Sequence, residues 1–375
     1  MSNKNYFAIP QAAPICVGTG LLALDIVINE DNKTPPRLWA GGSCGNVLTI
    51  LSYLGWQSYP IARLGNDTAA QEIRADLTQY QVRLDFVESD PKGCTPIILE
   101  KIRLKRDGTP THRFLLVCPN CGSWFPRYKS ILLKKARGIL DKLPEIKTFY
   151  FDKVSPGAIE IACAARACGS LVVFEPSSIG NETLFQKALR TCHILKYAHE
   201  RLEGIDKITQ EVSPLLQVET LGQEGLRYRI CRGNRHREKW LRIPAFSIER
   251  FRDAAGSGDW CTAGIIHVLG QDGSDRFENI SQDEIAEGLR FGQALAALNC
   301  LFDGARGGMY ALTKQDLRVA VEKIMLGYQS GVVASDTLPM EMSNMLEYVC
   351  PGCIPQSDRN RNRHQQDITQ NVGLV

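Results

Sequence analysis

The chain has 375 residues, of which 44% are hydrophobic and 23% are charged, so it can bury a sizeable core. Its formal net charge of +3 is too small to indicate a nucleic-acid partner. No apolar run reaches the roughly 18 residues of a membrane span, and the first residues lack a signal-peptide pattern, so we expect a cytoplasmic protein without a membrane partner. The thirteen cysteines, mostly single in apolar runs, favour reduced thiols.

The first predicted elements are a β-type run over 15–28 and a helix over 44–54. Further along, strand and helix patterns alternate. Strands are predicted at 146–152, 170–175, 192–196 and 215–220, with helices at 156–168 and 182–190 between them. Such alternation predicts an α/β fold in which a mostly parallel sheet is covered by helices on both faces.

Three further segments depart from this alternation. Residues 95–117 form two β-rich arms around the turn sequence RDGTP, which predicts an antiparallel hairpin in a small additional sheet. Residues 281–301 carry Ala and Leu at helical spacing, which predicts a helix facing the core. The last residues, 357–375, are polar and aperiodic, and we expect them to be disordered.

Small residues lead into a predicted helix in the stretch RDAAGSGDWCTAGIIHVL (252–269). Glycines permit backbone conformations in which successive N–H groups point the same way, and a helix N-terminus adds further unpaired N–H groups. We expect these amides to bind a phosphate. The residues are Ala255, Gly256, Ser257 and Gly258. The negative charge of Asp259 would repel a phosphate, so its place here indicates a task, namely to take a proton from an attacking hydroxyl. The alternative is an ordinary glycine-rich loop with an acid early in the helix.

Five short blocks along the chain combine glycines with polar residues. They are GGSCGNVLTILSYLGW (41–56), ARLGNDTAAQEI (62–73), VETLGQEGLRY (218–228), DAAGSGDW (253–260) and FGQALAALNCLFDGA (291–305). In this order the blocks resemble those of the PfkB/ribokinase family of carbohydrate and nucleoside kinases. The resemblance implies a ribokinase-like three-layer α/β/α sandwich over residues 1–330. A small β lid would come from about 26–40 and 95–117, and residues 331–375 would form a C-terminal extension.

The resemblance also implies an activity. Family members use ATP and Mg²⁺ to phosphorylate an alcohol hydroxyl of a sugar or related small molecule, with Asp259 here as the general base. Two alternatives stay open: a nucleoside kinase, and a non-catalytic protein that senses sugar or nucleotide on the kinase fold. Because family members often dimerise through the lid, the resemblance implies a homodimer as well.

The remaining blocks supply two sets of candidate binding residues. Acceptor hydroxyls would meet a strand-end carboxylate, a glycine pair and a helix amide, namely Asp25, Gly41, Gly42 and Asn46. The nucleotide would lie against the strand-turn-strand block and a later helix, at Thr220, Gly222, Gly225 and Asn299. Ordinary structural roles compete with each of these: a solvated strand end, a helix N-terminal polar residue, a plain hairpin turn and a polar helix end.

The chain departs from the family pattern in three places. Ala254 stands where the family commonly has Thr, and the aromatic residue after Asp259 is displaced. The family's N-x-x-E block, which is linked to Mg²⁺, should fall within 194–204, but no Asn occurs there. Glu200 or Glu203 remains as a candidate to hold a water bound to Mg²⁺.

Two cysteine pairs lie far apart in the sequence, in VCPNCG (117–122) and VCPGCI (349–354). Two cysteines separated by two residues suit a tight turn that points both sulfurs at one metal, and four thiolates make a tetrahedral Zn²⁺ site. We therefore expect a structural zinc site at Cys118, Cys121, Cys350 and Cys353. Free loop thiols and a redox pair are the alternatives.

Overall fold

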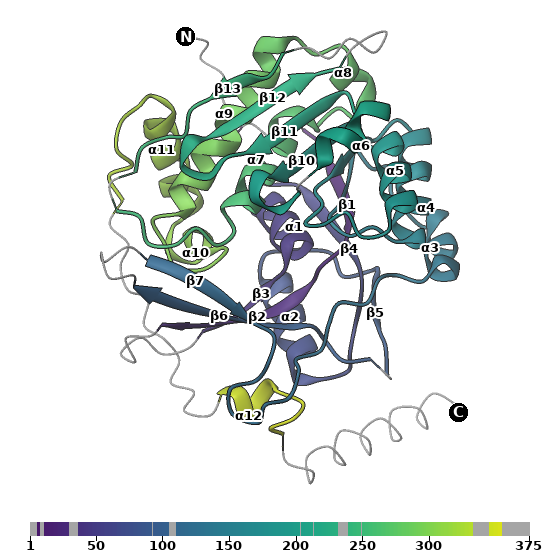
Figure 1. The fold of residues 1–375 in the computed structure, drawn as a ribbon, viewed down its shortest axis with the longest axis vertical. Coiled ribbons are helices and arrows are strands. Elements are labelled where there is room, and N and C mark those ends of the chain that lie inside the picture. The colour runs from purple at the N-terminus through teal and green to yellow at the C-terminus, as the bar shows by residue number, and fades with distance from the viewer. Residues whose placement is uncertain are drawn as a thin grey trace.

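The computed structural model of the chain describes residues 6–7, 11–29, 37–91, 93–104, 110–202, 204–212, 214–231, 239–248, 250–332 and 345–354. Within them a nine-stranded sheet forms the centre of the molecule (Figure 1). Its strands, in spatial order, are β13 (Leu241–Ile243), β12 (Leu226–Ile230), β11 (Leu216–Thr220), β10 (Ile194–Ala198), β9 (Leu171–Phe174), β8 (Thr148–Phe151), β1 (Ile15–Thr19), β4 (Gln57–Leu64) and β5 (Val87–Ser89). The strands from β11 to β5 run parallel, whereas β12 and β13 are antiparallel to their neighbours.

Successive side chains of the central strands enter two separate cores, as the pleat requires. In β9, Leu171 and Val173 join one core, and Val172 and Phe174 join the other. The first core is covered by α1 (Ser43–Tyr53), α2 (Thr68–Gln79), α7 (Ser257–Leu269), α8 (Ser274–Glu278), α9 (Gln282–Asn299), α10 (Gly307–Ala311) and α11 (Lys314–Met325). The second is covered by α3 (Leu133–Leu140), α4 (Pro156–Ala167), α5 (Glu182–Thr191) and α6 (Ile205–Glu211). The predicted three-layer α/β/α sandwich is confirmed.

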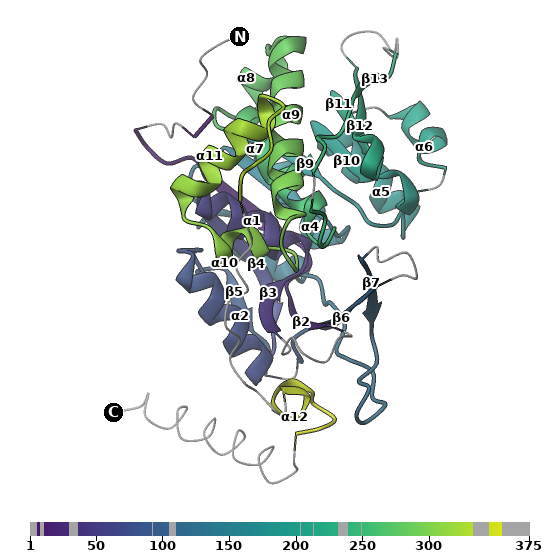
Figure 2. The same cartoon turned by 90° about the vertical axis from the view of Figure 1, so that its left-hand side faces the viewer.

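A smaller sheet forms the predicted lid. Its strands, in spatial order, are β3 (Arg37–Gly41), β2 (Ala23–Asn29), β6 (Ile97–Leu104) and β7 (Pro110–Leu115). The β6–β7 pair is the antiparallel hairpin that residues 95–117 predicted, although its turn lies outside the described residues, as do residues 30–36 of the first lid segment. Figure 2 shows the lid strands to one side of the central sheet, beyond the ends of its strands.

The single β run predicted over 15–28 is wrong in one respect, because it is divided between the two sheets. The Leu21 N–H donates to Asp152 Oδ1 at 3.0 Å, which draws the chain out of the central sheet after β1. The chain then enters the lid as β2, where it pairs with β3 and β6. Asp25 therefore lies inside a lid strand and not at the end of the first central strand.

Two helices near the end of the chain bear on the other predictions. α9 begins where the sequence placed it, since the Ser281 hydroxyl accepts from the Glu284 N–H and the Glu284 carboxylate accepts from the Ser281 N–H. α12 (Met345–Val349) is the last described helix, and the predicted disorder of 357–375 concerns residues outside the described ones. None of the described helices has the length and apolarity needed to cross a membrane.

Candidate functional site

The candidate site lies where the carboxyl ends of central strands meet the start of α7. Asp152 directly follows β8, Glu175 directly follows β9, and Lys196 lies within β10. All three contribute to the electrostatic environment of Asp259 in the first turn of α7. In parallel α/β sheets ligands bind at this edge, so the topology gathers these charged groups at one position.

The loop before α7 is held in place by a close backbone contact. Gly256 has φ +70°, and a Cβ atom on it would stand 2.1 Å from the Ala305 carbonyl oxygen. Asp253 supports the loop from below, because its carboxylate accepts from the Ala255 N–H at 3.0 Å and from the Gly304 N–H at 2.8 Å. The glycine at 256 is therefore required both by its φ angle and by its neighbour.

Asn299 supports the same loop from α9. Its amide nitrogen donates to the carbonyls of Ala255 at 3.1 Å and Gly304 at 3.3 Å, and its oxygen accepts from the Gly308 N–H at 3.2 Å. Its side chain is buried. The amide is therefore bonded to backbone groups and shapes the loop, and the nucleotide contact predicted for Asn299 remains a prediction.

The predicted anion site is smaller than expected. The Ala255 N–H already donates to Asp253 Oδ1, and the Ser257 N–H donates to the Ala254 carbonyl at 3.1 Å. Both amides, which the sequence predicted to bind a phosphate, therefore have protein acceptors. Among the described residues, the amides of Gly256, Gly258 and Asp259 have no acceptor. These three N–H groups lie at the N-terminus of α7, where the helix dipole favours an anion.

Asp259 is a half-buried carboxylate held by α1. Asn46 Nδ2 donates to its Oδ2 at 2.7 Å. Burial and then the negative charge of Glu175 raise the pKa of Asp259, Asn46 and Lys196 oppose the shift, and the net result is a pKa of about 7. A carboxyl group that titrates near neutral pH is suited to accept a proton from a hydroxyl. Asn46 thus contacts the predicted base, as well as being a candidate to bind an acceptor.

A buried network lies directly behind the start of α7. Lys196 Nζ is 2.5 Å from Glu175 Oε1 and donates to the Gly258 carbonyl at 3.2 Å. Glu175 Oε2 accepts from the hydroxyls of Thr262 at 2.6 Å and Tyr150 at 3.1 Å. Burial lowers the pKa of Lys196, but the charge of Glu175 outweighs it and leaves the pKa raised. The network fixes the first turn of α7 and sets the charge beside Asp259.

On the lid side, Asp25 stands against Gly41. A Cβ on Gly41 would lie 1.8 Å from Asp25 Oδ2, so glycine is required there to make room for the carboxylate. Asp25 Oδ1 and Asn46 Oδ1 are buried without a hydrogen-bond partner among the described residues. Burial raises the pKa of Asp25 to about 7, and the charge of Arg306 opposes this. Buried acceptors without partners are costly, so they indicate a polar ligand between lid and sheet.

Arg306 ties the lid to α2. Its guanidinium bonds to the Ala40 carbonyl and to Asp76 Oδ2, and Asp76 Oδ2 also accepts from the Ala40 N–H at 2.8 Å. Beside it, the rings of Trp39 and Tyr310 stack with centroids 5.0 Å apart. Gly42 follows directly as the N-cap of α1. These contacts hold Gly41 and Gly42, which the sequence predicted to bind the acceptor, at the junction of lid and sheet.

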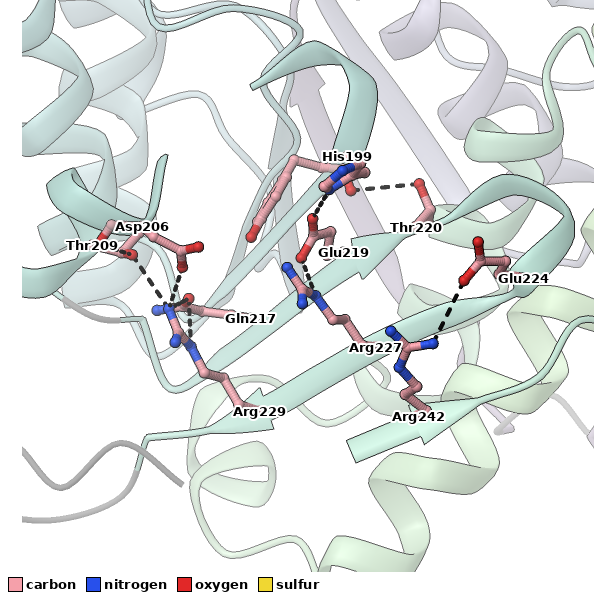
Figure 3. Close-up of polar contacts among 11 residues, drawn as sticks. His199, Asp206, Thr209, Gln217, Glu219, Thr220, Glu224, Arg227, Arg229 and Arg242 are labelled. Atoms are coloured by element: carbon pink, nitrogen blue, oxygen red, sulfur yellow. Dashed lines mark hydrogen bonds and ion pairs between the residues drawn. The ribbon is translucent and has the colours of Figure 1, made fainter. Parts of the chain in front are cut away.

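Three of the four predicted nucleotide residues, Thr220, Gly222 and Gly225, lie at one turn, and Figure 3 shows Thr220 at the end of β11. Thr220 ends β11, and the short 3₁₀ helix η2 (Gly222–Glu224) followed by Gly225 leads into β12. The Thr220 hydroxyl donates to the Tyr197 carbonyl at 3.4 Å. This geometry is that of the plain turn that the sequence left as an alternative, and a role in nucleotide binding remains a prediction.

Glu200 lies in the 3₁₀ helix η1 (His199–Arg201), which directly follows β10, and its side chain is exposed. The neighbouring His199 turns instead to β11, where its Nδ1 is 2.5 Å from Glu219 Oε1 (Figure 3). Glu219 also bonds to Arg227 of β12. The position expected for the metal-linked block is therefore a surface turn at the correct end of the sheet.

Comparison with known proteins can now be set beside this geometry. The family described as pfkB family carbohydrate kinase matches residues 18–111. These residues comprise the last two residues of β1, all of the strands β2 to β6, α1, α2 and the start of β7. The predicted resemblance to the PfkB family is confirmed. No curated protein matches the chain.

Solved structures share the fold over most of the chain. A fructokinase from Xylella fastidiosa with bound ATP has 17% identity and a TM-score of 0.60, covering 78% of this chain and 93% of its own. Arabidopsis thaliana ribokinase, complexed with ribose and ATP, has 19% identity and a TM-score of 0.57, covering 84% and 99%. A Burkholderia thailandensis nucleoside kinase in complex with inosine has 16% identity and a TM-score of 0.60, covering 84% and 99%. At such identities the likeness shows the ribokinase-like fold.

Sequence reasoning missed several residues of this candidate site. Asp152, Glu175 and Lys196 are charged residues directly after or inside buried strands, in FYFD, VVFE and ILKYA. A charge that ends an apolar run in a parallel sheet points to the ligand-binding edge, so this signal was present. Arg306 follows the predicted Gly-Ala turn and gave no such signal.

The four predicted metal-ligand cysteines are brought together at the other end of the lid. The sulfurs of Cys118, Cys121, Cys350 and Cys353 all lie within 4.8 Å of one another. Residues 229 to 235 positions apart in the chain thus meet in one cluster. The cluster forms outside the candidate active site, between the loop after β7 and the residues after α12.

Proposed function

We propose that the protein is an ATP-dependent phosphotransferase of the pfkB type that phosphorylates an alcohol hydroxyl of a sugar or related small molecule. The observation that carries the proposal is Asp259, a carboxyl group with a pKa of about 7, held by Asn46 next to amides that have no acceptor within the part of the chain that the structure describes. The fold shared with sugar and nucleoside kinases supports it. A nucleoside is the alternative acceptor.

The proposed reaction needs three functions from the chain. The acceptor lies between lid and sheet, with hydroxyls bonded to Asp25 and Asn46. Asp259 accepts the hydroxyl proton while the oxygen attacks the terminal phosphorus of ATP and the bond to the leaving ADP breaks. The amides of Gly256, Gly258 and Asp259 donate to the phosphoryl oxygens, where negative charge is concentrated. Thr220, Gly222 and Gly225 would contact the nucleotide.

The residues present also fit Mg²⁺. Carboxylate oxygens are the ligands that this ion prefers, and the negative charges of Glu175 and Asp152 raise the pKa of Asp259. Because both oxygens of Glu175 are bonded to Lys196, Thr262 and Tyr150, Asp152 and Asp259 are the residues that would hold the ion, directly or through water. Glu200 stays a second candidate for a metal-bound water. When bound, Mg²⁺ neutralises the charge of the phosphates.

Three finer proposals accompany the reaction. The lid exposes Phe114, Leu116 and Trp124, which supports a homodimer formed through the lid. A cytoplasmic location is consistent with the free thiols. A structural Zn²⁺ at the four clustered cysteines belongs to the proposal as an ion outside the reaction.

The test is ADP formation over a panel of sugars and nucleosides with Mg·ATP. The proposal expects turnover that depends on one acceptor class. A sensing protein on the same fold would instead show thermal stabilisation by a ligand without ADP. Stabilisation by ATP and a panel member, with no ADP above background, would overturn the kinase proposal.

A further inference from the structure

The cysteine cluster has the dimensions of a single tetrahedral metal site. Cys118 Sγ lies 3.6 Å from Cys353 Sγ, and Cys121 Sγ lies 3.8 Å from Cys350 Sγ. Each close pair joins one cysteine of the first knuckle to one of the second. A tetrahedron with metal–sulfur bonds of about 2.3 Å spaces its sulfurs about 3.8 Å apart. The two close pairs thus have the separation that one bound ion requires, and every other pair lies within 4.8 Å.

Other uses of four cysteines fit these distances less well. A disulfide requires sulfurs about 2.0 Å apart, so the pairs stand open. An iron–sulfur cluster places several metal atoms between its cysteines and requires wider separations than the 4.8 Å seen here. Four thiolates around one ion, with no position left for water, are the ligand set of structural zinc.

The first knuckle is an extension of the lid. Val117 and Trp124 form an antiparallel bridge that continues from β7, and the Phe125 N–H donates to the Leu116 carbonyl at 2.9 Å. The chain then returns to the lid, where the Ile97 N–H donates to the Pro126 carbonyl at 3.3 Å at the start of β6. A metal ion bound by Cys118 or Cys121 would therefore be attached to both strands of the lid hairpin.

The second knuckle is attached to α2 through α12. Leu346, Val349 and Cys350 are buried, and the Tyr348 hydroxyl donates to Glu72 Oε1 of α2 at 3.0 Å. Figures 1 and 2 show α12 at the foot of the molecule, near α2 and the lid strands. α2 in turn carries Asp76, which bonds to the Ala40 N–H of β3.

These contacts connect the two edges of the lid sheet in one continuous path. It runs from the β6–β7 hairpin through the first knuckle, across the cysteine cluster to the second knuckle, along α12 to α2, and through Asp76 to β3 on the opposite edge of the same sheet. Between α12 and the hairpin, the cluster is the link that a metal would make covalent.

We propose that Cys118, Cys121, Cys350 and Cys353 bind one Zn²⁺ that fastens the C-terminal segment to the lid and thereby fixes the lid sheet from both edges. Zinc binding and lid order do not depend on the kinase activity. Only the consequence for function, that loss of zinc weakens acceptor binding more than ATP binding, rests on the proposed function.

The first measurement is metal content of the full chain, purified under reducing conditions without chelator. One zinc per chain is expected for the wild type. Cys121→Ser and Cys353→Ser should each lower the zinc content per chain at least tenfold. Cys168→Ser, which changes an exposed cysteine at the end of α4, should leave the zinc content unchanged. Less than a tenth of an equivalent of zinc, iron in its place, or two disulfides by mass spectrometry would overturn the site.

The second measurement is hydrogen exchange of the wild type before and after zinc removal by a chelator, with zinc added back as the control. Faster exchange is expected in β6, β7 and residues 345–349, with α4 and α5 unchanged, and zinc should restore the slow exchange. Because this uses the unaltered chain, a variant that fails to fold does not block the test. Bound zinc whose removal leaves lid exchange unchanged would overturn the fastening role, and neither readout changes if the protein is not a kinase.

Discussion

The pKa of Asp259 offers a sharp test of the site, since two neighbouring charges act on it in opposite directions. Glu175 raises the pKa and Lys196 lowers it. Glu175→Gln removes the negative charge while keeping the size of the side chain and its capacity to bond to Thr262 and Tyr150. Lys196 then stands beside Asp259 with its charge uncompensated, so both changes lower the pKa of Asp259.

The expected size follows from the position of Glu175. Its Oε1 lies 3.8 Å from the place where a Cβ on Gly258 would stand, one residue before Asp259. At an effective dielectric of about 20, two carboxylates roughly 8 Å apart repel by about 2 kcal/mol, or roughly 1.5 pKa units, and we take this as the scale of the expected shift. At pH 6 the ionised fraction of Asp259 would rise from about one tenth to about three quarters.

The assay is kcat/KM for the best acceptor between pH 5 and 9, with each variant normalised to its own plateau, because this parameter reports the free enzyme. Activity should rise with pH through an apparent pKa of about 7 in the wild type, since the base must be ionised. Glu175→Gln should move that midpoint down by at least one unit. Thr262→Val, which removes a bond to Glu175 without a change of charge, is the control and should leave it in place. A folded Glu175→Gln protein with an unmoved midpoint would refute the electrostatic account.

Two further predictions concern stability. Gly256→Ala should lower the free energy of unfolding by more than about 1–2 kcal/mol, because a Cβ there needs a left-handed residue and meets the Ala305 carbonyl; in denaturant titrations Gly258→Ala, whose Cβ would meet Glu175 and Lys196 only at an ordinary contact distance of 3.8 Å, should be near neutral, and equal effects would contradict the loop geometry. Burial raises the pKa of Asp25 and of Asp152 above the unfolded value of about 4, to about 7 and about 6, so between these values the native state binds more protons. The free energy of unfolding of the ligand-free protein should therefore fall from pH 5 to pH 8, and Asp25→Asn should flatten that fall; an unchanged slope would contradict it.

Much of the fold was predictable because the central strands are mostly apolar runs. LVVF and ILKYA are buried on both faces and read as strands without any knowledge of their neighbours. The run 15–28 misled because its pattern does not change where the chain leaves the sheet. That exit depends on Asp152, 131 residues away from Leu21. Local pattern cannot supply a partner so distant.

The candidate site was also predictable in part. Asp259 and the glycines before it are adjacent in sequence, so their proximity needed no fold. How the loop is supported was not predictable, because Asp253 and Asn299 bond to backbone groups of the distant Gly304–Gly308 turn. Glu175 and Lys196 gain their role only when β9 and β10 lie side by side and α7 begins beside them.

The most direct test of the central claim, that Asp259 is the base of a phosphoryl transfer, is the rate of ADP formation by Asp259→Asn with the best acceptor. The account predicts a loss of at least about 10²-fold, with the ATP-induced shift in Tm retained. Asp283→Asn, an exposed acid in the first turn of α9, is the matched control and should keep full activity. Near-normal turnover by a folded Asp259→Asn protein would contradict the account.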